Sequence, residues 1–255
     1  MKPPPFDYVR SHTVDDALEA LTAEDAKVLA GGQSLVPLLA MRLARPAVLV
    51  DVNPLPLTGI EVVDGEVRIG ALVRHADLAA TTASPLLAEA AALVGHPAIR
   101  NRGTIGGSLA HADPVAELPC ALLALGGSVV AAGRAGTRTI AADDLFEGFL
   151  VTTLAPDELL VEVRVPVRDH VGFAEWAPRC GDFAVVAVAV VLEPDGAVRA
   201  AASGVANRPV DISDAFADRD ERAVRAAVTR ACAGDDDKAE LAGLLAVRAL
   251  AQAAA

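Results

Sequence analysis

The sequence feature that most constrains the fold is a glycine-bearing segment from Arg100 to Pro114. It reads Arg-Asn-Arg-Gly-Thr-Ile-Gly-Gly-Ser-Leu-Ala-His-Ala-Asp-Pro and has no long side chain at its centre. Its three glycines allow positive φ angles and a close approach of the main chain to a ligand, and Thr104 and Ser108 add hydroxyl groups beside backbone N–H donors. We interpret the segment as a loop that holds a phosphate or pyrophosphate.

A second loop of the same character lies at Ala30–Leu35, with the sequence Ala-Gly-Gly-Gln-Ser-Leu, and two such loops can close on one ligand. A Gly-Gly pair alone is more often a simple turn. Neither segment has the lysine of a P-loop or the G-x-G-x-x-G pattern of a dinucleotide fold. The sequence therefore supports neither an ATP-hydrolysing P-loop nor a Rossmann domain.

Composition narrows the class of protein. The chain has 255 residues, of which 53% are hydrophobic, enough for a substantial core and for one or two domains. Its three widely spaced cysteines include no C-x-x-C pair, so we expect no disulfide framework, zinc site or iron–sulfur site, and a reducing cytoplasm. The N-terminus lacks an apolar signal core, and no apolar run reaches the ~18 residues of a membrane span.

Charge and aromatic content argue against nucleic acid as a partner. The net charge is −12 and aromatic residues make up 3% of the chain, so phosphate backbones are repelled and stacking platforms are scarce. No catalytic or metal-ligating set is evident either. His111 beside Asp113 is more typical of a loop-ordering histidine than of a general base, and the aspartate runs lack calcium-loop spacing. Two ligand-holding glycine loops without catalytic acid–base groups favour a redox flavoprotein, because a flavin supplies the reactive atoms itself.

Periodicity and turn residues predict an α+β chain in three parts. Residues 1–56 form a β-loop-helix-β unit whose first helix begins at a capping box of Thr13 and Asp16. Residues 57–168 begin with a hairpin at Asp64-Gly65 and continue through helices, including an apolar one from Pro114 to Leu125 that Pro119 should interrupt or kink. Residues 169–255 form a three-stranded antiparallel sheet with two helices, and the predicted strands are Phe173–Ala177, Phe183–Leu192 and Val198–Val205.

Four segments together resemble the FAD-binding medium subunit of molybdenum hydroxylases, the family of carbon monoxide dehydrogenase medium subunits and of the FAD domain of xanthine dehydrogenase. They occur in the family's order and at its separations and span almost the whole chain. These segments are Ala30–Leu38, Met41–Pro46, Ile99–Pro119 and Gly181–Ala184.

The resemblance implies a two-part FAD-binding domain of the vanillyl-alcohol-oxidase (PCMH) type over residues 1–168, with subdomains of about 1–56 and 57–168. The family's small C-terminal α+β domain would follow at 169–255. The two loops would hold the FAD pyrophosphate through backbone N–H groups, without a covalent bond to the cofactor. The implied loop residues are Ala30, Gly31, Gly32, Gln33, Ser34, Leu35, Thr104, Ile105, Gly106, Gly107 and Ser108.

Four further residues fall at FAD-contacting positions of the family. Asp113 and Glu117 match polar contacts to the ribityl and adenosine parts, whereas Leu154 and Phe183 match apolar residues beside the isoalloxazine. Without the resemblance, Phe183 is equally well interpreted as a buried strand residue.

The chain also departs from the family. Relatives commonly carry a lysine and paired arginines before the Gly-Asp pair, whereas this chain has Glu175 and Pro178-Arg179. Asp237 stands about where a tyrosine is often found. These changes put cationic tuning of the flavin in doubt.

By the resemblance, the FAD passes electrons from two [2Fe–2S] clusters on a small partner subunit to an external acceptor. A large partner subunit oxidises the substrate at a molybdopterin centre, and we expect a dimer of heterotrimers. The sequence identifies neither the substrate nor the acceptor. Two alternatives stay open, a free-standing flavin-dependent oxidase or reductase, and a non-catalytic nucleotide-binding scaffold.

Overall fold

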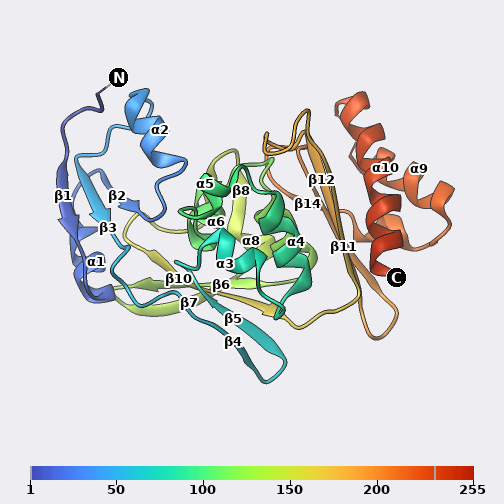
Figure 1. Ribbon diagram of the computed structural model, residues 1–255, viewed down its shortest axis with the longest axis horizontal. Helices are drawn as coiled ribbons and strands as arrows, with labels where there is room; N and C mark the ends of the chain where they lie inside the picture. The colour runs from blue at the N-terminus through green and yellow to red at the C-terminus, as the bar shows by residue number, and fades with distance from the viewer. Residues whose placement is uncertain (1, 233) are drawn as a thin grey trace.

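The computed structural model of the chain describes residues 2–232 and 234–255 and shows three sheets side by side along its long axis (Figure 1). The first is a parallel sheet of order β1-β3-β2, formed by Asp7–Arg10, Val48–Asp51 and Ala26–Leu29. Helices α1 (Val14–Ala20) and α2 (Leu35–Ala40) provide the crossovers. This unit matches the β-loop-helix-β arrangement that the sequence predicts.

The capping box of α1 is confirmed. The Thr13 hydroxyl accepts from the backbone N–H of Asp16 at 3.1 Å, and the Asp16 carboxylate accepts from the Thr13 N–H at 2.9 Å. Two N–H groups without an intrahelical acceptor are thereby satisfied. Hydrogen bonding lowers the pKa of Asp16.

The middle sheet is antiparallel, of order β4-β5-β10-β6-β7, and its first hairpin turns at Asp64-Gly65, both at positive φ, as predicted. Short helices and a small two-stranded hairpin lie on one face of this sheet or at its edge (Figure 1). The strands are Ile60–Val63, Glu66–Gly70, Leu159–Pro166, Ser128–Gly133 and Gly136–Ala141. The other elements are α3 (His75–Ala79), α4 (Pro85–Leu93), α5 (Pro97–Arg100), α6 (Ile105–His111), α7 (Glu117–Ala124), α8 (Ala142–Leu145) and the hairpin of β8 (Phe146–Gly148) with β9 (Val151–Thr152).

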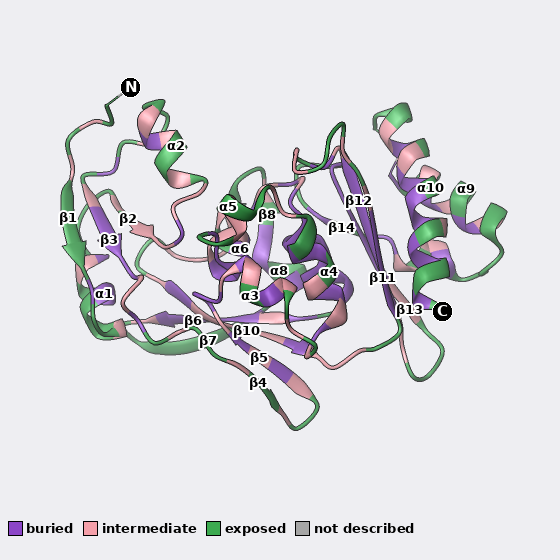
Figure 2. Ribbon diagram, in the orientation of Figure 1, coloured by how far each residue is buried: buried purple, intermediate pink, exposed green. Residues whose placement is uncertain are grey.

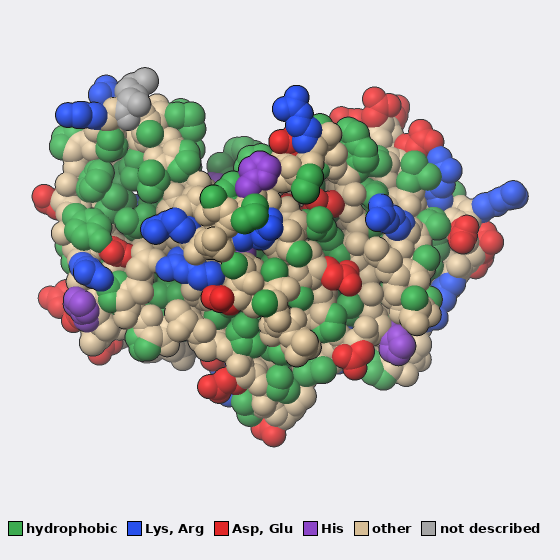
Figure 3. All heavy atoms as spheres, in the orientation of Figure 1, with side chains coloured by type: hydrophobic (Ala, Val, Ile, Leu, Met, Phe, Trp, Pro, Cys, Tyr) green, Lys and Arg blue, Asp and Glu red, His purple; other side chains and the backbone are tan. Residues whose placement is uncertain are grey.

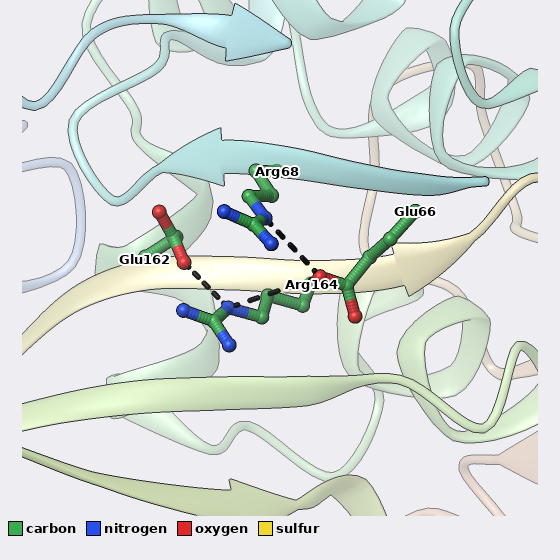
Figure 4. Close-up of polar contacts among 4 residues, drawn as sticks. All are labelled: Glu66, Arg68, Glu162 and Arg164. Carbon is green, nitrogen blue, oxygen red and sulfur yellow. Dashed lines mark hydrogen bonds and ion pairs between the residues drawn. The ribbon is translucent and has the colours of Figure 1, made fainter. Parts of the chain in front are cut away.

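Alternation along β5 and β10 separates the two faces of this sheet. Val67, Ile69 and Val163 are buried in the core, whereas the intervening charged residues form ion pairs on the other face (Figure 4). Arg164 contacts Glu162 at 2.5 Å and Glu66 at 4.0 Å, and Arg68 contacts Glu66 at 3.3 Å. Because Arg68 and Arg164 are direct cross-strand partners, the glutamates offset their repulsion. Partly exposed pairs of this kind contribute little stability.

Helix α7 is the most deeply buried helix of the middle part. All of its residues are buried. They lie in the middle part of the molecule, where much of the ribbon is purple (Figure 2). The expected kink at Pro119 is wrong, because the helix runs continuously from Glu117 to Ala124. Pro119 is the third residue of α7, and in the first turn the missing N–H would have had no intrahelical acceptor.

The third sheet is antiparallel and has four strands, so the three-stranded prediction is wrong by one strand. Its order is β11-β12-β13-β14, formed by Val171–Trp176, Val186–Leu192, Val198–Ser203 and Val210–Asp211. Only two residues of β14 pair with β13, too short a run for alternation to reveal. A 3-10 turn (Ser213–Phe216), α9 (Glu221–Ala231) and α10 (Asp236–Ala253) complete the chain.

The two faces of this third sheet belong to different cores. Val186, Val188 and Val190 pack with α9 and α10, whereas Ala187 and Ala189 share a cluster with α4, α7 and the middle sheet. The hydrophobic core is therefore continuous across residue 168, where the sequence predicts a domain boundary. That boundary stays a prediction. Within residues 2–232 and 234–255, no helix is both long and apolar enough to cross a membrane.

Candidate functional site

The first glycine loop connects β2 to α2. Gly32 has φ +74, a left-handed conformation that favours glycine, and Ser34 precedes the helix without a side-chain capping bond. Within the described chain, no protein group accepts a hydrogen bond from the backbone N–H groups of Gly31, Gly32, Gln33 or Ser34. Four consecutive unpaired donors at the start of a helix suit an anion.

The second loop is a helix start rather than an open loop. The Thr104 hydroxyl caps α6 by accepting from the Gly107 N–H at 3.1 Å. The N–H groups of Ile105, Gly106 and Ser108 donate to the carbonyls of Val73, Ala71 and Thr104. The expectation that these N–H groups are open to a ligand is therefore not met in this structure.

The glycines of the second loop serve close packing and not positive φ, which corrects the sequence-based interpretation. A Cβ on Gly106 would lie 2.7 Å from the Cβ of Ala71, and one on Gly103 would lie 2.8 Å from Nδ1 of His75. Both contacts are too close for real atoms. The side chain of Ile105 is fully buried in the core, and its backbone N–H is already paired with Val73.

The two glycine loops touch each other through their backbones. A Cβ on Gly31 would lie 2.9 Å from the Cα of Gly103 and would overlap the carbonyl oxygen of Arg102. Only a glycine allows this approach of two backbones. Loops that are 70 residues apart in sequence thus form one continuous backbone surface.

A polar network that the sequence did not reveal fixes this contact. Asn53 donates from Nδ2 to the carbonyl of Ala30 at 2.8 Å and accepts at Oδ1 from Arg74 Nη2 at 2.8 Å. Arg74 also donates to the carbonyl of Arg102, and Asp51 accepts from Asn53 Nδ2 at 2.6 Å. Because Asn53 and Arg74 flank no glycine motif, only their spatial position identifies them.

For the FAD that the family resemblance implies, we expect Arg74→Lys to weaken binding about 10-fold. Lysine retains the charge, but it cannot bond the Asn53 amide and the Arg102 carbonyl in the fork geometry of a guanidinium, which removes roughly 1.4 kcal/mol of positioning energy. Fluorescence titration of FAD measures the change. Arg68→Lys, on the far face of the middle sheet, is the matched control. An unchanged FAD affinity in Arg74→Lys would contradict this role of the network.

The His75 side chain packs against the second loop. It is buried under Gly103, and its backbone N–H donates to the Gly103 carbonyl at 3.0 Å. Burial lowers the pKa of the imidazole to about 4, with nearby Arg74 and Arg100 adding to the decrease. The ring is therefore neutral at physiological pH and acts as packing, not as a base.

Downstream of α6 the chain turns through Ala112, which is left-handed with φ +52, and carries Asp113 towards Glu117. The Asp113 carboxylate accepts from the Val115 N–H at 3.1 Å. Glu117 is the first residue of α7 and is only 6% exposed. Burial raises the pKa of Glu117 to about 7, and repulsion from Glu175 and Asp113 adds to the rise. The structure thus brings Asp113, Glu117 and the departure at Glu175 into one acidic group.

The two apolar candidates differ in environment. Leu154 is half-buried against the main core, whereas Phe183 is 74% exposed on the turn between β11 and β12. The interpretation of Phe183 as a buried strand residue is wrong, since β12 begins at Val186. An aromatic ring so exposed has no packing role within this chain and is free to contact another molecule.

The surface is hollowed between the lobe that carries α2 and the middle of the molecule, with Lys and Arg side chains below the hollow (Figure 3). The first loop leads into α2, which belongs to the lobe on one side of this hollow (Figure 1). No group of three or more metal-ligating side chains is present in the described chain. Burial lowers the pKa of His111, and the charge of Asp113 opposes this decrease only in part. The environment of His111 therefore does not indicate a general base.

The fit of these residues to a dinucleotide can be judged from the loops alone. The unpaired N–H donors of the first loop lie next to the glycine contact between the loops, where the two backbones approach closely, and such an arrangement suits a pyrophosphate. Residues 4–168 match the family described as FAD binding domain in molybdopterin dehydrogenase. The chain belongs to the FAD-binding medium subunits of molybdenum hydroxylases.

Similar proteins and solved structures support this family assignment. The medium subunit of nicotine 6-hydroxylase from Paenarthrobacter nicotinovorans is 44% identical over 226 residues, which cover 84% of this chain and 80% of the relative. The carbon monoxide dehydrogenase medium chain from Hydrogenophaga pseudoflava is 40% identical over 206 residues, covering 77% and 72%.

Similarity to a solved structure covers nearly the whole chain. A chain of a solved structure of carbon monoxide dehydrogenase from Hydrogenophaga pseudoflava superposes with a TM-score of 0.93 at 36% identity, covering 99% of this chain and 98% of that one. The expected α+β fold of the PCMH type is thereby confirmed. This medium subunit is the FAD-binding component of a multi-subunit oxidoreductase, in a family where molybdenum and iron–sulfur centres lie on partner subunits.

Proposed function

We propose that this chain holds one FAD non-covalently across the two glycine loops. The observation that carries the proposal is the backbone contact of Gly31 with Arg102–Gly103, which joins four unpaired N–H donors to the start of α6. Charge-assisted hydrogen bonds contribute roughly 1.5–3 kcal/mol each, so a few of them retain a dinucleotide tightly.

The proposed contacts divide by kind. The first loop contributes backbone N–H donors. The second loop lets its backbone approach the cofactor closely and contributes the Ser108 hydroxyl. Asp113 and Glu117 contribute polar contacts to the rest of the cofactor. Leu154 and the exposed ring of Phe183 flank the isoalloxazine. The proposed site comprises Ala30, Gly31, Gly32, Gln33, Ser34, Leu35, Thr104, Ile105, Gly106, Gly107, Ser108, Asp113, Glu117, Leu154 and Phe183.

Bound FAD would supply electron transfer, passing electrons from the [2Fe–2S] clusters of a small partner subunit to an external acceptor. This chain's residues bind and orient the cofactor and leave one side accessible. We further propose a dimer of heterotrimers with a small and a large subunit, in the cytoplasm. Three free cysteines fit that compartment.

The absorption spectrum of the purified chain, before and after addition of FAD, tests the proposal. We expect flavin bands and, after denaturation, release of about one FAD per chain, since the loops form one pyrophosphate site. A chain that stays colourless with excess FAD would contradict the cofactor assignment. Bleaching by a small substrate in the absence of partners would instead favour a free-standing flavin enzyme.

The subunit arrangement is tested separately. Co-expression with the small and large subunits encoded by the same organism, followed by size exclusion with light scattering, should give a mass of two heterotrimers. A medium subunit that elutes alone would contradict the assembly but not FAD binding.

A further inference from the structure

Asp51 anchors the polar network that joins the two glycine loops. It is the last residue of β3, the central strand of the first sheet, and it pairs in register with Leu29, after which the first loop begins. Asp51 is 8% exposed and lies at the carboxyl end of two parallel strands, the edge at which open α/β sheets hold ligands. A buried charge at this edge requires hydrogen-bond partners.

Both oxygens of the Asp51 carboxylate have donors. Oδ1 accepts from the Asn53 backbone N–H at 3.0 Å and from Asn53 Nδ2 at 2.6 Å, whereas Oδ2 accepts from the Tyr8 hydroxyl. Burial opposes ionisation, but these hydrogen bonds lower the pKa of Asp51 below its usual value. Asp51 is therefore an ionised acceptor at neutral pH, and each hydrogen bond to it is charge-assisted.

The Asn53 amide fits this network in only one orientation. Its Nδ2 faces two acceptors, the Asp51 carboxylate and the Ala30 carbonyl, and its Oδ1 faces the donor Arg74 Nη2. The reversed amide would place its oxygen against two oxygens and its nitrogen against a guanidinium, so none of these hydrogen bonds could form. Asp51 therefore determines which end of the amide reaches Arg74.

Asn53 and Arg74 in turn hold the two loops. Asn53 donates to the Ala30 carbonyl of the first loop at 2.8 Å. Arg74 donates to the Arg102 carbonyl of the second loop, and that oxygen is the atom that a Cβ on Gly31 would overlap. Asn53 and Arg74 lie in different predicted subdomains, so the hydrogen bond between them joins these parts where their loops meet.

Tyr8 extends the network to the molecular surface. It lies on β1, an edge strand of the first sheet at one end of the molecule (Figure 1), and it is 54% exposed. The hydrogen bond to Asp51 raises the pKa of the Tyr8 phenol, so the hydroxyl keeps its proton and remains a donor. An exposed side chain is thus connected to the loop contact through Asp51, Asn53 and Arg74.

We propose that Asp51 and Tyr8 are positioning residues for FAD, which fix the orientation of Asn53 and thereby the contact between the two glycine loops. The proposal rests on the FAD site proposed above. Asp51 and Tyr8 act through Asn53 and Arg74. Loss of a hydrogen bond to Asp51 lets the loops separate, and FAD affinity falls although no group of the proposed cofactor site is removed.

FAD titration of variants of the full chain tests the proposal. We expect Tyr8→Phe to weaken FAD binding about 3-fold and Asp51→Ala about 10-fold, because the first loses one hydrogen bond of the network and the second loses several. Asp51→Asn retains an acceptor oxygen for Asn53 and should recover part of the loss. Asp7→Asn is the matched control, because Asp7 is exposed on β1 and points to the face of the sheet opposite Tyr8.

The double variant Tyr8→Phe/Asp51→Ala separates positioning from a general loosening of β1. Effects that pass through one shared partner are not additive. We therefore expect the double variant to bind FAD about 10-fold more weakly than the unaltered chain, as Asp51→Ala does alone, rather than about 30-fold. Additive losses, or equal losses in Asp51→Asn and Asp51→Ala, would overturn the proposal.

Amide NMR spectra of the cofactor-free chain report on the loops without FAD. Tyr8→Phe should shift the signals of Gly31 and Gly103 and leave that of Gly196, on the turn between β12 and β13, unchanged. Unchanged FAD affinity in Tyr8→Phe and Asp51→Ala would overturn the positioning role and leave the FAD site intact. No FAD binding by the unaltered chain would overturn both the site and this role.

Discussion

Gly31→Ala should lower the affinity for FAD by roughly 100-fold or more. The added methyl group would overlap the Arg102 carbonyl oxygen and lie 2.9 Å from the Cα of Gly103, and neither backbone can move as a flexible side chain does. The loops must separate. Loss of two charge-assisted hydrogen bonds, at roughly 1.5–3 kcal/mol each, corresponds to a factor of about 100 to 20,000 in affinity.

The measurement is the FAD dissociation constant by fluorescence or absorbance titration. Gly59→Ala is the matched control, because a Cβ there meets nothing within 4 Å and its φ is not in the left-handed region. Both variants should retain the far-ultraviolet circular dichroism of the unaltered chain. If Gly31→Ala bound FAD as tightly as Gly59→Ala, the contact between the loops would not be the site of the cofactor.

A chain that ends at Arg168 should not fold as a stable monomer. Truncation after Arg168 removes the third sheet, and with it side chains that share one core with α4 and α7, among them Val171, Phe173 and Val191. At roughly 1.5–3 kcal/mol for each large apolar side chain, the lost burial is on the order of 10 kcal/mol. That loss is comparable with the entire stability of an ordinary domain, about 5–15 kcal/mol.

We expect this fragment to aggregate or to show no cooperative transition in calorimetry. Trp176 lies beyond residue 168, so amide NMR dispersion is a better probe of its packing than tryptophan fluorescence. The full chain, cut by a protease site inserted between residues 168 and 169, should remain associated. A monomeric fragment with a sharp melting transition would show instead that residues 1–168 are an independent domain.

Local chemistry made several elements predictable. The capping box at Thr13 and Asp16 and the hairpin at Asp64-Gly65 depend on residues within three or four positions of each other, so the sequence contains the whole signal.

The wrong predictions have a common cause, because the position of a residue in the tertiary structure outweighed the local conformational preference of its residue type. Pro119 was expected to break α7, but its place in the first turn makes proline harmless. The glycines of the second loop were expected at positive φ, yet they are small because Ala71 and His75 lie against them. Phe183 was expected equally in a strand core, and it lies exposed on a turn.

The sequence by itself determined the two glycine loops, most of the helices and strands, and the family, because each rests on residues that are close along the chain or on motifs in a fixed order. The tertiary structure alone decided that Gly31 meets Arg102 and that Asn53 and Arg74 hold that contact. These pairs lie 21 to 71 positions apart, and hydrophobic burial, which is non-directional, brings them together only when the whole core forms.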